Sequence, residues 1–91
     1  MTPVAPYRVV QENRFERLKA ALLAERLEET VEPHLNSQVR RAANEAAALA
    51  WVTPYPLLVF PVLFEEKVEA ALRISERQEE VLRHTRELLA V

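Results

Sequence analysis

Apolar side chains recur at helical spacing along most of the chain, since residues three, four and seven positions apart share one helix face. From about Arg8 to Val31 they form adjoining stripes, which predict a first helix whose wide apolar face contacts more than one neighbour. A second helix is predicted from about Ser37 to Val52, where most apolar positions are alanine. Because small side chains let helix backbones approach closely, we expect this helix to pack tightly against its neighbours.

The last predicted helix, from about Pro61 to Ala90, separates charged and apolar positions most clearly. Charged residues such as Glu76 and Arg83 fall on one side of it, and apolar residues fall on the other. At about 1.5 Å per residue this helix would span roughly 45 Å. A compact monomer of this size does not need that length, so we expect part of the helix to contact another chain.

Three uncharged polar residues, Ser75, Gln78 and Thr85, run along the apolar face of this last helix. One interpretation is a buried polar line that fixes the register between helices, as a polar core position does in a coiled coil. The alternative is that these side chains lie at the edge of the face or hydrogen-bond to the preceding helical turn.

An uncharged segment, residues 46–64, joins the second helix to the last one, and prolines interrupt it. Since a residue before a proline favours extended backbone, we expect an apolar elbow at 53–61. Residues 57–60 are compatible with either a short strand or one helical turn, because so short an apolar run has no decisive period.

The first residues carry two prolines and no helical period, so we predict an extended N-terminal arm over 1–7 and a single helical domain over 8–91. Met1 and its neighbours do not resemble a basic and apolar leader, and we expect a cytoplasmic protein.

The composition narrows the fold class, because the chain contains no glycine, no aspartate and no cysteine. Hairpin turns often require positive φ, which makes a β-rich fold without glycine difficult to build. The prediction is therefore an all-α fold of two long amphipathic helices and a shorter alanine-rich helix. A chain of 91 residues buries only about 60–65% of the surface that its unfolded form exposes, and it has no disulfide to compensate. We expect oligomerisation to complete this helical hairpin or bundle.

We therefore predict a homodimer or higher oligomer, and another protein is a further candidate partner. The predicted interface combines the elbow with the apolar face of the last helix, and its residues are Trp51, Tyr55, Leu57, Leu58, Phe60, Phe64, Val68, Leu72, Ser75, Gln78, Leu82, Thr85 and Leu89.

Residues that support catalysis are scarce in this sequence. Without glycine there is no phosphate-binding loop or nucleophile elbow, and without aspartate there is no Ser–His–Asp triad. His34 and His84 are the only histidines. Glu80 and His84 are four residues apart and could share a metal, but a zinc site needs three or four ligands. We predict solvated histidines, no metal, no cofactor and no enzymatic activity.

The predicted function is a non-enzymatic scaffold, adaptor or assembly subunit, and two alternatives remain open. The first is a dimeric DNA-binding regulator or antitoxin-like protein that uses Arg40 and Arg41. The net charge of −2 and the nearby Glu45 oppose this alternative, because DNA binding normally needs a basic surface.

The second alternative is a membrane-associated protein that inserts residues 46–64. This segment approaches the length of a membrane span, and Trp51 and Tyr55 are suited to the membrane interface. Its prolines argue against insertion, because they would leave backbone carbonyls without hydrogen-bond partners in lipid.

Overall fold

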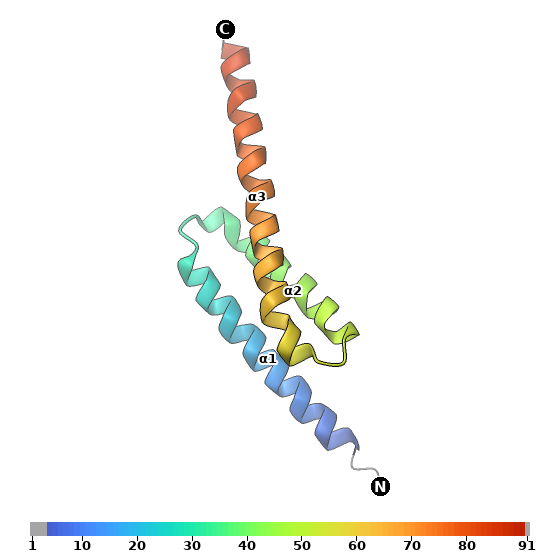
Figure 1. The fold of residues 1–91 in the computed structure, drawn as a ribbon. Helices are drawn as coiled ribbons and strands as arrows, with labels where there is room; N and C mark the ends of the chain where they lie inside the picture. The colour runs from blue at the N-terminus through green and yellow to red at the C-terminus, as the bar shows by residue number, and fades with distance from the viewer. Residues whose placement is uncertain (1–3, 91) are drawn as a thin grey trace.

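The computed structural model describes residues 4–90, which form three α-helices and one short 3-10 helix (Figure 1). The elements in chain order are α1 (Val4–Glu29), η1 (Pro33–Leu35), α2 (Asn36–Val52) and α3 (Pro56–Ala90). The described residues contain no strand, and the predicted all-α fold is confirmed.

The first helix begins earlier than its apolar pattern predicts. Residues 4–7 belong to α1 and are helical, which corrects the extended arm predicted over 1–7; residues 1–3 lie outside the described residues. Pro6 is compatible with this helix start, because the first N–H groups of a helix have no acceptor within the helix. At the other end, Thr30 donates its backbone N–H to Leu27 O at 3.2 Å and its Oγ1 hydroxyl to Arg26 O at 2.8 Å.

The elbow is shorter than the predicted segment 53–61. Pro56 begins α3, so residues 57–60 are helical and do not form a strand. Proline suits this first position because its missing N–H would have no acceptor there. Thr53 closes α2 by donating its hydroxyl to Ala50 O at 2.7 Å, and its own Oγ1 accepts the Tyr55 N–H at 3.3 Å.

The core lies mainly between α2 and α3, and α1 contacts both (Figure 1). The buried residues of α2 are all small or β-branched: Val39, Ala42, Ala43, Ala46, Ala47 and Ala50. They pack in one cluster with Phe15 of α1 and with Phe60, Phe64 and Val68 of α3. The alanine face therefore provides close packing, and the phenylalanines provide most of the buried aromatic area.

Aromatic contacts join the three helices at one end of the core. The Phe15 ring centroid lies 5.2 Å from that of Phe60 and 4.9 Å from that of Trp51. Phe60 in turn stacks on Phe64 at 5.5 Å, one helical turn further along α3. Such pairs add about 0.5–1.5 kcal/mol each beyond the burial of their area.

The molecule is elongated, with principal extents of 74 × 23 × 19 Å. Its radius of gyration is 18.0 Å, whereas a compact chain of this length would have about 12 Å. Figure 1 shows the reason: α1 and α2 accompany only the first half of α3, and the second half projects beyond them. No helix among the described residues combines the length and the apolar character needed to cross a membrane.

Candidate interaction surface

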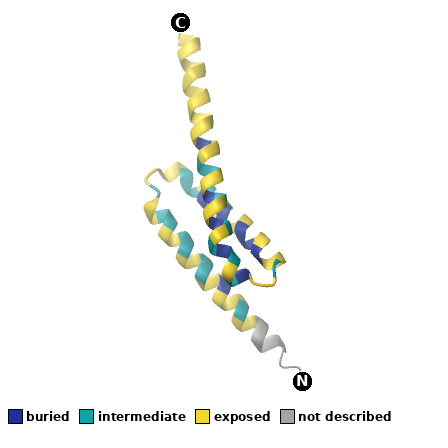
Figure 2. Ribbon diagram, viewed as in Figure 1, coloured by how far each residue is buried: buried dark blue, intermediate teal, exposed yellow. Residues whose placement is uncertain are grey.

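The projecting half of α3, residues 76–90, is exposed at every position (Figure 2). We call this segment the α3 arm. It contains neither proline nor glycine and consists largely of Glu, Arg and Leu, which are strong helix formers. Thr85 donates its hydroxyl to Val81 O at 2.9 Å, within the preceding turn. Such an isolated helix is only marginally stable in water, so packing would stabilise it further.

An apolar face runs along the arm and begins at the edge of the core. Its large side chains are more than half exposed: Ile74 at 58%, Val81 at 59%, Leu82 at 56%, Leu88 at 65% and Leu89 at 82%. Positions 74, 78, 81, 85 and 88 alternate spacings of four and three, which is the pattern of a coiled-coil stripe. Leu82 and Leu89 adjoin this stripe and widen it. Over 74–90 the face extends about 25 Å at 1.5 Å per residue.

The predicted oligomer-interface residues separate into two groups. One group lies inside the single chain: Phe60, Phe64, Val68 and Ser75 are buried, and Leu57 and Leu72 are partly buried. Those side chains are used in the core, and the four buried ones have no surface for a partner in this fold. The other group is exposed and comprises Trp51, Tyr55, Leu58, Gln78, Leu82, Thr85 and Leu89.

The uncharged polar residues on α3 do not form one buried line. Ser75 is 6% exposed and accepts a hydrogen bond at 3.5 Å from Nε2 of Gln38 on α2. Thr85 is exposed and bonds to the preceding turn, as in the second interpretation. Gln78 is exposed between them.

Arg40 and Arg41, which the DNA-binding alternative would use, are both exposed on α2. Arg41 lines a groove of about 290 Å³ between α2 and α3, together with Glu45 and Lys67. The charges along this groove are of both signs, so it does not form a uniformly basic surface for a phosphate backbone.

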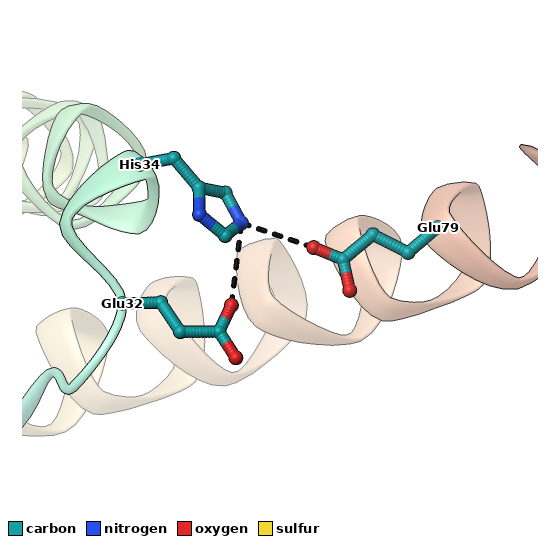
Figure 3. Close-up of side chains that lie close together, drawn as sticks. All are labelled: Glu32, His34 and Glu79. Atoms are coloured by element: carbon teal, nitrogen blue, oxygen red, sulfur yellow. Dashed lines mark hydrogen bonds and ion pairs between the residues drawn. The ribbon is translucent and has the colours of Figure 1, made fainter.

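A second group of polar side chains gathers where the arm leaves the core (Figure 3). His34 Nε2 lies 3.0 Å from Glu79 Oε1 on α3 and 3.3 Å from Glu32 Oε2, which belongs to the connection between α1 and α2. The side chains are 51–57% exposed. One potential ligand atom from each residue lies within 4.8 Å of the others. We call these residues the His34 cluster.

The His34 cluster is not visible in the sequence. Helical spacing points to the local pair of Glu80 and His84, whereas His34 contacts a glutamate 45 positions away. Helical spacing reveals local pairs only, and the contact between His34 and Glu79 depends on how the α1–α2 connection lies against α3.

A scan against protein-family models finds no match for this chain, and searches of curated proteins and of solved structures find none either.

Proposed function

We propose that this protein is a non-enzymatic interaction module that self-associates through the α3 arm and serves as a scaffold or assembly subunit. The observation that carries the proposal is the apolar face of the arm. This face extends beyond the core, and no described segment covers it there. Single exposed apolar residues are common on protein surfaces. A contiguous stripe of them indicates an interaction surface instead.

A second copy of the chain fits this face in an antiparallel arrangement. With the centre of the pair between Val81 and Leu82, Ile74 meets the second copy's Leu89, and Gln78 meets the second copy's Thr85. Val81 then meets the second copy's Leu82, so large apolar side chains face one another at the centre and at both ends of the pair, and the amide of Gln78 reaches a hydroxyl that can accept or donate a hydrogen bond.

The antiparallel arrangement also separates the two cores. Each arm ends beside the start of the other arm, so the α1 and α2 helices of the two copies lie at opposite ends of the pair. The resulting interface is the same patch on both copies, which closes into a dimer and does not propagate into a filament.

The test is the absolute mass in solution, measured by light scattering over a concentration series. We expect the wild-type chain to be a dimer and the double variant Val81→Gln, Leu88→Gln to be a monomer. The matched control is Arg83→Gln, Glu87→Gln, which introduces the same side chain on the charged face and should remain a dimer. All four positions are exposed, so the single-chain core should be intact in both variants. A monomeric wild-type chain, or equal masses for both double variants, would refute the proposal.

Disulfide trapping tests the orientation, because the sequence contains no cysteine of its own. The antiparallel arrangement predicts that Ile74→Cys chains, when mixed with tagged Leu89→Cys chains, form a mixed disulfide dimer. It also predicts that Ile74→Cys alone does not cross-link. Efficient cross-linking of Ile74→Cys alone would instead indicate parallel arms and contradict the antiparallel arrangement.

A further inference from the structure

We propose that Glu32, His34 and Glu79 form a binding site for a divalent transition-metal ion of the Zn²⁺ class. A metal bound there would link the segment between α1 and α2 to α3, at the point where the α3 arm begins. This inference is independent of self-association, since all three ligands belong to one chain.

The distances in the His34 cluster are those between neighbouring ligands of one metal ion. With metal–ligand bonds of about 2.0–2.1 Å, neighbouring ligand atoms lie roughly 3.3 Å apart in a tetrahedron and roughly 2.9 Å apart in an octahedron. The separations of His34 Nε2 from the carboxylate oxygens of Glu79 and Glu32 are 3.0 and 3.3 Å. The third separation, between the two carboxylates, is within 4.8 Å, so binding would draw Glu32 and Glu79 toward a shared ion (Figure 3).

The donor set indicates the class of metal. One imidazole nitrogen with carboxylate oxygens suits Zn²⁺ and its first-row neighbours. Ca²⁺ and Mg²⁺ prefer sites made of oxygen atoms alone. Because the side chains are about half exposed, water can occupy the remaining coordination position, as in zinc sites with three protein ligands.

The charges of the cluster also favour a cation. Among the described residues, the ion pairs of Glu32 and Glu79 both go to His34. A divalent ion balances the charges of both carboxylates, and an imidazole coordinates a metal through a ring nitrogen that carries no proton.

The test is titration of the 91-residue chain with zinc chloride, followed by isothermal calorimetry. We expect saturable binding of about one zinc per chain. His34→Ala and Glu79→Gln should each weaken it about tenfold or more, because even the loss of a residue that only supports a metal ligand typically costs about 10–100-fold in affinity, and each change here removes a ligand itself. The matched control is His84→Ala, which removes the other histidine, on the arm, and should bind zinc as the wild type does. Far-UV circular dichroism should be the same for all variants, because the changed side chains are exposed.

Three results would overturn the inference. The first is the absence of saturable heat with the wild-type chain. The second is a loss of binding in His84→Ala that equals the loss in His34→Ala, which would place the ion at Glu80 and His84. The third is zinc-dependent mass in light scattering, which would mean that the ion bridges two copies and does not bind within one chain. A dimer whose mass is insensitive to a chelator, together with one zinc per chain, would support both proposals separately.

Discussion

Replacing Phe60 by alanine tests the packing of the core. Phe60 is 0% exposed and contacts the rings of Phe15 on α1 and Phe64 on α3. Truncation of a buried phenylalanine to alanine costs about 3–5 kcal/mol, which includes the lost burial and the cavity left behind. A chain of 91 residues has a free energy of unfolding of roughly 5–14 kcal/mol. Phe60→Ala should therefore remove a large part of the stability.

The assay is urea unfolding monitored by far-UV circular dichroism at one fixed protein concentration, since association would make the midpoint depend on concentration. With a slope of about 1–3 kcal/mol per molar urea, the midpoint should fall by about 1 M or more. Leu58→Ala is the control: it lies on the same helix but is 73% exposed, and it should cost less than about 1 kcal/mol. Equal losses for the two variants would mean that Phe60 is not buried in a shared core, and the packing argument would fail.

Other predictions follow from contacts within the chain. Ala46→Leu should destabilise the fold by about 1–3 kcal/mol in urea unfolding, because it adds volume at a fully buried position, whereas Ala48→Leu on the exposed side should be nearly neutral. Thr53→Val should cost about 1 kcal/mol in the same assay, because it removes the hydroxyl that bonds to Ala50 O and to the Tyr55 N–H. Phe15→Ala should shift the fluorescence emission of the single tryptophan, Trp51, to longer wavelength, because the indole loses the ring 4.9 Å away; an unchanged spectrum would contradict that contact.

Periodicity predicted the helices well because each helix has a consistent apolar face. Five of the six alanines of α2, all but Ala48, are buried, as their small size suggested. The helix ends were harder to place, since they depend on local backbone bonds. Leu58 and Val59 both donate their N–H groups to Tyr55 O at 3.1 Å, and this extends α3 back to Pro56 although Pro61 also fits a helix start.

The partner of each apolar face could not be predicted from the sequence. A hydrophobic pattern indicates that a side chain is buried without indicating which segment covers it. Phe60 and Leu82 lie on the same helix and were assigned to one interface; the structure buries the first at 0% exposure and leaves the second at 56%. The difference arises from how far α1 and α2 extend along α3, which is a property of the tertiary arrangement.

The chain reversal between α1 and α2 determines how far along α3 these two helices pack. Between Glu29 and Asn36 the chain turns back, because Pro33 cannot continue α1 as an ordinary helical residue. The α2 helix then starts beside Ser75 and runs back toward the elbow, as the contact of Gln38 with Ser75 indicates. The contact of His34 with Glu79 lies about one helical turn beyond Ser75 along α3. The same helical pattern continues beyond that point, where no described segment covers it, and the second copy that we propose would bring an arm face of the same length.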